Sequence, residues 1–261
     1  MDKNLAAAQV IASARRSLTR LPPLDPALAP QNLSEGYRIQ DSLHGILTAD
    51  LGPIVGYKIG CTSAVMQKYL AISHPCSGGL YAHGVYESGV TLSASNFVRI
   101  GVECEIAVRI AHDLVRTGVP FTGATVGEAV GEYFPAIEIV DDRYVKWETL
   151  GAPTLIADDF FSSGIVLGKS KARSEVPDLL SVHGRALING VEGGKGTGAD
   201  LLGHPHNALA WLANHLAEQG KGLKAGQIVM TGSLVQTIWV NAGDVIDMDY
   251  GTFGSVRLTL S

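Results

Sequence analysis

The chain has 261 residues, of which 46% are hydrophobic and 17% are charged, so it can bury a large core and is not disordered throughout. Its 20 Lys and Arg against 25 Asp and Glu give a net charge of −5, which argues against binding nucleic acid or an anionic membrane. Three cysteines are too few for a disulfide scaffold, and they lack the spacing of a zinc site. Without an apolar run that could cross a bilayer or serve as a signal peptide, a cytoplasmic protein is expected.

The first 53 residues are expected to form a small helical region. Apolar residues recur at helical spacing from Asn4 to Leu18, which predicts a first helix. The prolines between Leu21 and Gln31 exclude a helix there and predict an extended connector. A second helix is expected to begin near Ser34, with Ser34 as its N-cap.

Residues 54–261 predict a larger, mixed β core as one compact unit. Short β-prone segments alternate with glycines, as in a chain with many tight turns. Asn189-Gly190 predicts a hairpin, and one helix is expected over 206–219. The glycine-rich segment 190–198 lacks the spacing of a phosphate-binding loop, so it is expected to be a flexible turn or, alternatively, a mobile lid. The expected strands include Ile54–Ile59, Ile106–Ile110, Ile165–Leu167, Ile228–Met230, Val245–Met248 and Val256–Leu260.

Acidic residues in two of the β-prone segments are candidates for a metal site. In a strand, Glu103 and Glu105 share one face and Cys104 points to the other. Two sheltered carboxylates repel each other, and Mg²⁺ or Mn²⁺ is the simplest compensation. Glu138 stands alone among apolar residues and is a third candidate ligand. The pattern by itself favours an alternative, in which Glu103 and Glu105 lie on a solvated face and Glu138 forms a salt bridge.

Lys58 lies in an apolar segment between Gly56 and Gly60. The pattern alone favours a lysine that protects an edge strand. The alternative is a site residue, because a nearby metal would lower the pKa of its ammonium and suit it to proton transfer.

Five motifs occur in a characteristic order along nearly the whole chain. They are Gly56–Gly60, Glu103–Glu105, Ala136–Arg143, Gly203–Pro205 with Ala210–Asn214, and Ala225–Ser233. Together they resemble the 2-keto-4-pentenoate hydratase and 4-oxalocrotonate decarboxylase family, within the fumarylacetoacetate hydrolase superfamily.

The resemblance implies an α+β fold, with a mixed β-roll core of the fumarylacetoacetate hydrolase C-terminal type and a small helical N-terminal part. It implies Mg²⁺ or Mn²⁺ bound by Glu103, Glu105 and Glu138, with Lys58 as the catalytic residue. It also implies a homo-oligomer, alone or in complex with a partner enzyme, that serves aromatic catabolism and acts on a small 2-oxo acid or its enol.

The expected reaction is hydration of a 2-hydroxypenta-2,4-dienoate-like substrate to a 4-hydroxy-2-oxo acid. The alternatives are decarboxylation of a 4-oxalocrotonate-like diacid, hydrolysis of an acylpyruvate, and a non-catalytic binding protein or partner subunit. Ser163 and Thr231 are candidates for binding the substrate carboxylate. Equally, their hydroxyls could be satisfied by the backbone.

Two positions depart from the family pattern. Cys76 stands where the family carries an aspartate that is thought to help proton transfer. The segment Ala157–Gly164 lacks the usual asparagine. Both departures leave the expected metal ligands in place, and the cysteine keeps the non-catalytic alternative open.

Overall fold

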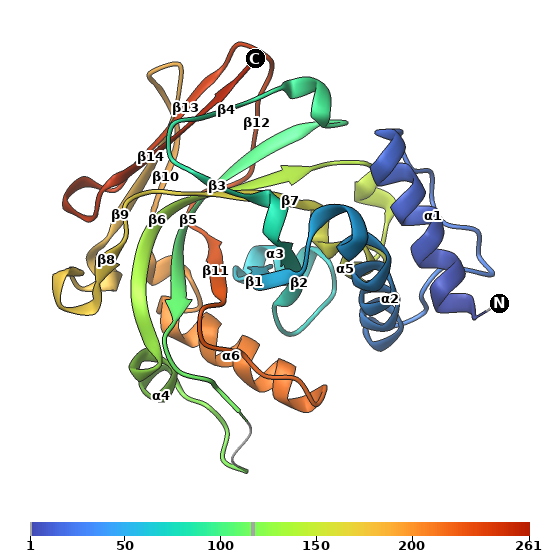
Figure 1. Cartoon of the computed structure of the whole chain (residues 1–261), viewed down its shortest axis with the longest axis horizontal. Helices are drawn as coiled ribbons and strands as arrows, with labels where there is room; N and C mark the ends of the chain where they lie inside the picture. Colours follow the sequence, from blue (N-terminus) through green and yellow to red (C-terminus); the bar gives the residue numbers. More distant parts are fainter. Residues whose placement is uncertain (1, 116–117) are drawn as a thin grey trace.

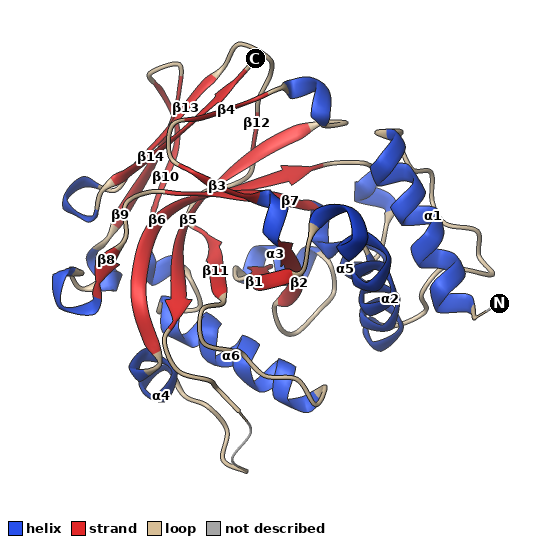
Figure 2. Cartoon of the chain, viewed as in Figure 1, coloured by secondary structure: helices blue, strands red, loops and turns tan. Residues whose placement is uncertain are grey.

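The computed structural model describes residues 2–115 and 118–261, so Met1 of the predicted helical region lies outside it. Helices and two mixed sheets make up the described chain (Figures 1 and 2). The α-helices are α1 (Lys3–Ser17), α2 (Leu33–Leu51), α3 (Ala64–Tyr69), α4 (Gly123–Glu128), α5 (Ala152–Ala157) and α6 (Pro205–Glu218). The helix predicted over 206–219 is therefore confirmed as α6.

The strands follow the β-prone segments, and several extend beyond them. They are β1 (Ile54–Gly60), β2 (Cys76–Tyr81), β3 (Val85–Glu87), β4 (Val90–Leu92), β5 (Ile100–Ile110), β6 (Val130–Asp141), β7 (Ser162–Leu167), β8 (Lys171–Ala172), β9 (His183–Ile188), β10 (Val191–Thr197), β11 (Ile228–Ser233), β12 (Ile238–Trp239), β13 (Val245–Asp249) and β14 (Ser255–Leu260).

The larger sheet has the strand order β2-β1-β11-β5-β6-β7-β3, with β12 added to β5 and β8 to β6. The smaller sheet has the order β10-β9-β13-β14-β4. The main apolar core joins both sheets and α6, for example through Ile106, Leu212 and Leu258. The opposite face of β5 and β6 carries a smaller apolar cluster that includes Ala107 and Ala136. The α+β fold with a mixed β core is therefore confirmed.

The helices α1, α2 and α5 gather at one side of the larger sheet, on the right in Figure 1. They share an apolar core with later parts of the chain, in which Ile11 and Leu43 are grouped with Leu155 and Phe160. The helical region is thus packed against the residues that precede β7. The division of the chain at residues 53 and 54 stays a prediction.

The second helix begins slightly earlier than predicted. Its N-cap is Asn32, whose Oδ1 accepts a hydrogen bond from the backbone N–H of Glu35 at 2.9 Å. Ser34 lies inside the helix, and its hydroxyl accepts a hydrogen bond from Arg38. Asparagine and serine both cap well, so the prediction of Ser34 as N-cap chose the wrong one of two suitable residues.

The glycine-rich segment after Asn189-Gly190 is a strand, so the flexible-turn interpretation of 190–198 is wrong. The predicted hairpin itself is confirmed, because β10 pairs with β9 in antiparallel register. A Cβ on Gly196 would lie 1.9 Å from the carbonyl oxygen of Leu234. A glycine at this position permits close backbone approach between neighbouring segments rather than flexibility.

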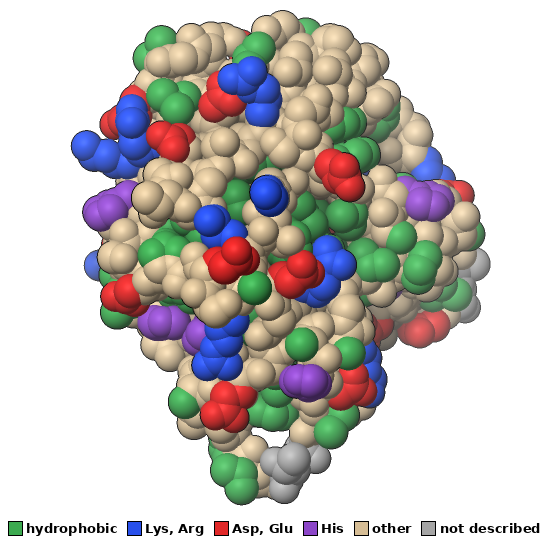
Figure 3. All heavy atoms as spheres, turned by 60° about the vertical axis from the view of Figure 1, so that its left-hand side comes forward, with side chains coloured by type: hydrophobic (Ala, Val, Ile, Leu, Met, Phe, Trp, Pro, Cys, Tyr) green, Lys and Arg blue, Asp and Glu red, His purple; other side chains and the backbone are tan. Residues whose placement is uncertain are grey.

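Acidic and basic side chains are interspersed on the face shown in Figure 3. Several pair across the smaller sheet, such as Arg185 with Glu192 at 3.0 Å and Arg257 with Asp247 at 2.6 Å. Among the described residues, no helix has both the length and the apolar character needed to span a membrane.

Candidate active site and metal centre

Strands β5 and β6 bring three glutamates together. Their antiparallel register places Glu103 directly opposite Glu138, and Glu105 follows on the same face of β5. One carboxylate oxygen from each residue lies within 4.8 Å of the others. We refer to Glu103, Glu105 and Glu138 as the carboxylate cluster. Like charges directly opposite in a sheet are destabilising, so this arrangement calls for a compensating positive charge.

The carboxylate cluster is largely shielded from solvent and has spare acceptor atoms. Glu105 and Glu138 are 0% exposed, which excludes a solvated face for Glu105. The backbone N–H of Gly232 donates to Glu105 Oε2 at 2.9 Å, and the hydroxyl of Thr237 donates to Glu103. Glu105 Oε1 and both carboxylate oxygens of Glu138 have no hydrogen-bond partner within the described chain. Buried acceptor oxygens that face one another fit a hard divalent cation such as Mg²⁺.

Lys58 reaches the carboxylate cluster from the interior of the sheet. Strand β1 lies between β2 and β11, with Lys58 in register with Gly78 and Met230. The edge-strand interpretation of Lys58 is therefore wrong. Its Nζ lies 3.1 Å from Glu138 Oε1, although not in hydrogen-bond geometry, and the residue is 3% exposed.

Burial and charge shift the pKa values of these groups in the metal-free state. Burial raises the pKa of Glu138 to about 7, and the charge of Glu103 adds to this while Lys58 opposes it. Burial and the charges of Glu138 and Glu103 raise the pKa of Glu105 well above its usual range. Burial alone would lower the pKa of Lys58, but the three carboxylates outweigh it and raise this pKa. The site therefore contains more negative charge than it can hold fully ionised.

Three residues that support the glutamates were not identified from the sequence. Gly232 adopts a φ of +115°, and a Cβ there would lie 2.6 Å from Thr62, so glycine is required for its N–H to face Glu105. The hydroxyl of Tyr250, which directly follows β13 of the smaller sheet, lies 2.7 Å from the carbonyl oxygens of both Glu105 and Ala136 and donates to them. Thr237 lies in the segment after β11, and no pattern in the sequence indicates that its hydroxyl contacts Glu103.

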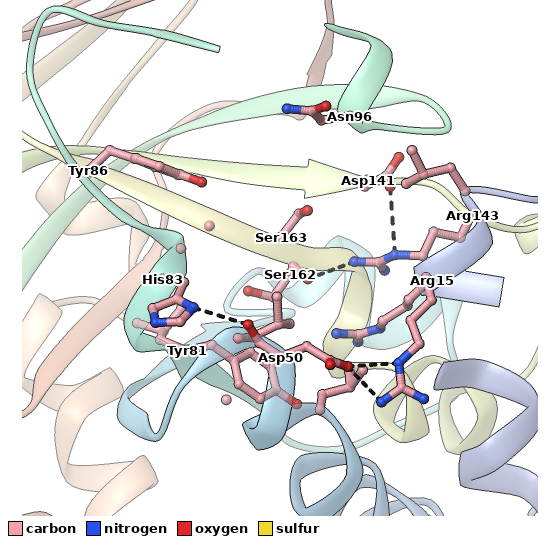
Figure 4. A pocket seen from close by; sticks show the side chains of 18 residues that line it. Arg15, Asp50, Tyr81, His83, Tyr86, Asn96, Asp141, Arg143, Ser162 and Ser163 are labelled. Atoms are coloured by element: carbon pink, nitrogen blue, oxygen red, sulfur yellow. Dashed lines mark hydrogen bonds and ion pairs between the residues drawn. The ribbon is translucent and has the colours of Figure 1, made fainter. Parts of the chain in front are cut away.

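The two residues predicted to bind the substrate carboxylate lie in different surroundings. Thr231 is 0% exposed, and its hydroxyl donates to the carbonyl oxygen of Ile106 at 2.7 Å. Ser163 lines a cavity of about 200 Å³, together with Arg143 and Asp141 (Figure 4). Among the described residues, the lining of this cavity includes neither Lys58 nor the carboxylate cluster. The substrate-binding roles of Ser163 and Thr231 stay predictions.

A second group of buried charges lies where the helical region meets β7. Arg15 Nε is 2.6 Å from Asp158 Oδ1, and Arg143 Nη1 is 3.1 Å from Asp158 Oδ2. Asp159 is held by His44 at 2.6 Å and by Arg15 at 3.2 Å. We refer to Arg15, His44, Arg143, Asp158 and Asp159 as the Arg–Asp network. It connects α1 and α2 to the segment that lacks the family's asparagine.

That segment has a strained backbone next to Lys58. Asp159, Phe160 and Phe161 all adopt positive φ, at 53°, 50° and 68°, which is unusual for residues with a Cβ. A Cβ on Gly60 would lie 3.4 Å from Lys58 Nζ and 3.9 Å from Phe160 Cγ. Gly60 therefore lies close to both the Lys58 ammonium and the Phe160 ring, and the Arg–Asp network holds the turn that carries Phe160.

This fold and site define the class of protein. Residues 80–261 match the fumarylacetoacetate hydrolase C-terminal family, and the chain belongs to that family. It is 31% identical to a 2-keto-4-pentenoate hydratase from Burkholderia vietnamiensis, over 100% of this chain and 98% of that protein. It is 33% identical to a 2-hydroxyhexa-2,4-dienoate hydratase from Comamonas testosteroni, over 92% of this chain and 90% of the relative.

The structure is also similar to a 4-oxalocrotonate decarboxylase from Pseudomonas putida G7, complexed with magnesium and adipate. The TM-score is 0.92 at 27% identity, and the match covers 99% of this chain and 97% of the other. The resemblance inferred from the five motifs is confirmed.

Proposed function

We propose that this chain is a divalent-metal-dependent hydro-lyase that hydrates a 2-hydroxypenta-2,4-dienoate-like substrate to a 4-hydroxy-2-oxo acid. The observation that carries the proposal is the carboxylate cluster beside Lys58, with buried acceptor oxygens that lack partners in the described chain. The names of relatives at 31% and 33% identity over almost the whole chain support hydration as the reaction.

In this proposal Glu103, Glu105 and Glu138 hold Mg²⁺ or Mn²⁺. When bound, the cation supplies positive charge that stabilises negative charge developing on the 2-oxygen of a 2-oxo acid. Gly232 and Thr237 orient Glu105 and Glu103 by donating hydrogen bonds to them. Tyr250 fixes the spacing of β5 and β6 from the opposite face of the sheet.

Lys58 moves the proton that interconverts the dienol and the ketone, after which water adds to the conjugated carbon. The carboxylate cluster raises the pKa of Lys58, and it does so less once its charge is neutralised. Burial, which lowers the pKa of an ammonium group, then has the larger influence. The lysine Nζ is thereby prepared to give up and regain a proton near neutral pH.

The second candidate function is decarboxylation of a 4-oxalocrotonate-like diacid. It is favoured by the similarity to the decarboxylase structure, with a TM-score of 0.92 over 99% of this chain. The same charge stabilisation at the 2-oxygen would promote loss of carbon dioxide from a suitably placed carboxylate.

A substrate panel distinguishes these functions. Purified protein with Mg²⁺ is given 2-hydroxypenta-2,4-dienoate, 2-oxohex-3-enedioate and an acylpyruvate in turn, and the loss of dienol or diketone absorbance is followed. Turnover of the dienoate supports the hydro-lyase, and turnover of the diacid with release of carbon dioxide supports the decarboxylase. If none is converted while Mg²⁺ still binds, the protein is a binding module or partner subunit and the proposal is wrong.

We further propose that the protein works as a homo-oligomer in the cytoplasm, in complex with a partner enzyme of aromatic catabolism. The family resemblance supports this assembly. Light scattering tests this assembly. It measures the mass of the protein in solution, first by itself and then after mixing with such an enzyme.

A further inference from the structure

Two cysteine thiols lie next to each other beside Lys58, and the proposed mechanism uses neither of them. Cys76 is the first residue of β2 and is fully buried, whereas Cys61 follows β1 directly and is partly exposed. Each of the two thiols shifts the pKa of the other, and the charge of Lys58 acts on both.

The backbone geometry is compatible with a disulfide between them. Gly60 is paired with Cys76 in the antiparallel register of β1 and β2, so Cys61 is one residue beyond a paired position. From the usual spacings within and between strands, the two Cα atoms are about 6 Å apart, inside the range that a disulfide bridges.

The conformation of Cys61 brings its side chain toward Cys76. In a regular strand, the residue after Gly60 would point to the opposite face from the partner of Gly60. Cys61 instead has a φ of +58°, a left-handed conformation that breaks this alternation and is costly for a residue with a Cβ. The strain persists next to a site that carries chemistry, where such strain is often functional.

The two thiols differ in reactivity. The neighbouring Cys76 thiol lowers the pKa of Cys61, burial opposes this effect, and the charge of Lys58 adds to it. The pKa of Cys76 is raised by the neighbouring Cys61 thiol and by burial. Cys61 is therefore the more accessible thiol and the one that more readily forms the thiolate.

We propose that Cys61 and Cys76 form a reversible dithiol–disulfide couple that responds to peroxides and lowers turnover when it is oxidised. The Cys61 thiolate attacks a peroxide oxygen, the O–O bond breaks and hydroxide leaves, so Cys61 becomes a sulfenic acid. The Cys76 sulfur then attacks the Cys61 sulfur, the S–S bond forms and the S–O bond breaks. The two thiols lose two electrons, and hydrogen peroxide is reduced to two molecules of water.

Oxidation would be transmitted to the carboxylate cluster through Thr62. Thr62 follows Cys61 directly and packs so tightly on Gly232 that a Cβ there would lie 2.6 Å from it. The N–H of Gly232 holds Glu105. A disulfide that moves Cys61 toward β2 therefore shifts Thr62 and disturbs a group of the proposed metal site. A displacement of about 1 Å in an active site costs roughly 10²-fold in rate.

The test treats the Mg²⁺-loaded full chain with hydrogen peroxide and follows two measurements. Peptide mass spectrometry is expected to find Cys61 linked to Cys76. Turnover of the dienoate is expected to fall by about 10²-fold and to return with dithiothreitol. The activity measurement rests on the proposed function. The mass measurement does not, so the two failures are distinguishable.

Matched variants make the result specific. Cys76→Ala is expected to form no internal link and to leave Cys61 as a sulfenic acid that dimedone traps. Cys104→Ala, which removes the third cysteine, is expected to form the link like the unaltered chain. The proposal is overturned if Cys61 and Cys76 stay reduced, or if Cys61 is oxidised further without a link. If the link forms and turnover is unchanged, its effect on activity is overturned.

Discussion

The carboxylate cluster and the Arg–Asp network are both buried, but their charges are balanced differently. Asp159 and Glu138 are each 0% exposed. Burial alone would raise the pKa of Asp159, yet His44, Arg15 and the N–H of Gly79 together lower it to about 2. For Glu138 burial prevails and raises the pKa to about 7, because Lys58 faces three carboxylates.

The comparison shows that burial alone does not fix the sign of a pKa shift in this protein. At Asp159 the neighbouring cations and donors reverse the effect of burial, whereas at Glu138 they do not. The Arg–Asp network contains its own cations and needs no ligand to be stable. The carboxylate cluster lacks positive charge, and this deficit is what indicates a metal site.

Replacement of Lys58 is expected to have the largest effect. Lys58→Ala removes the group proposed to move the proton, so kcat should fall by about 10²- to 10⁴-fold. Mg²⁺ affinity should hold or increase, because the carboxylate cluster loses a competing cation. Steady-state kinetics and titration calorimetry measure the two quantities, with Lys195→Ala, a lysine whose side chain is 75% exposed, as the control. An unaltered kcat in Lys58→Ala would remove this residue from the mechanism.

Disruption of the Arg–Asp network should affect folding stability rather than metal binding. Arg15→Ala leaves Asp158 and Asp159 with less compensating charge, which for a buried ion pair costs about 3–5 kcal/mol of unfolding free energy. Denaturant unfolding measures this cost. The matched control is Arg16→Ala, whose pair with Asp50 at 2.6 Å is half exposed and should contribute no more than about 1 kcal/mol. Equal losses in the two variants would contradict the structural role of the network.

Glu103→Gln should weaken Mg²⁺ binding. The variant keeps the shape of the side chain and removes one negative charge, so affinity should fall by at least the roughly 10- to 100-fold typical of groups around a metal. The control is Glu132→Gln on the neighbouring strand β6, where Glu132 pairs with Arg109 at 3.0 Å away from the carboxylate cluster. If calorimetry finds the same affinity in both variants, Glu103 is not a ligand.

A lower pH should weaken metal binding at the carboxylate cluster and leave the Arg–Asp network intact. This is the smallest of the expected effects. A cation must displace the proton of Glu138, so Mg²⁺ affinity should decrease as pH falls through about 7, by up to about tenfold per pH unit. Asp159 has a pKa lowered to about 2 from 3.8. Its contribution to stability is therefore present above pH 3.8 and is lost as pH falls toward 2. Calorimetry between pH 8 and pH 6 should show weaker Mg²⁺ binding. Unfolding of the metal-free chain, measured in parallel, should show no loss of stability, because Asp159 stays ionised and protonation of Glu138, whose pKa is raised to about 7, favours the folded state.

Much of the carboxylate cluster could be predicted because its pattern is local. Strand alternation places Glu103 and Glu105 on one face from their spacing alone. An isolated Glu138 among apolar residues indicates a buried partner. Only the family resemblance indicated that this partner is a metal ion shared with Glu103 and Glu105. The position of Lys58 in the interior of the sheet depends on the pairing of β1 with β11, which no local pattern encodes.

The features that the sequence did not predict depend on contacts between residues that are far apart along the chain. Arg15 and Asp158 are separated by 143 positions, and neither residue type indicates the other. Glycine composition misled the interpretation of 190–198, because glycine serves equally in turns and in strands that closely approach another backbone. The hydrogen bond that Thr237 donates to Glu103 likewise depends on the path of the chain after β11.

The direct pairing of Glu103 with Glu138 also has a consequence for folding. If β6 slipped by one residue against β5, the side chain of Glu138 would move to the opposite face and lie in the main apolar core. The carboxylates would then be divided between two faces, and no ion could be chelated by all of them. Binding of the proposed cation would therefore stabilise only the correct alignment of these two strands, and so would favour the native register over a shifted one.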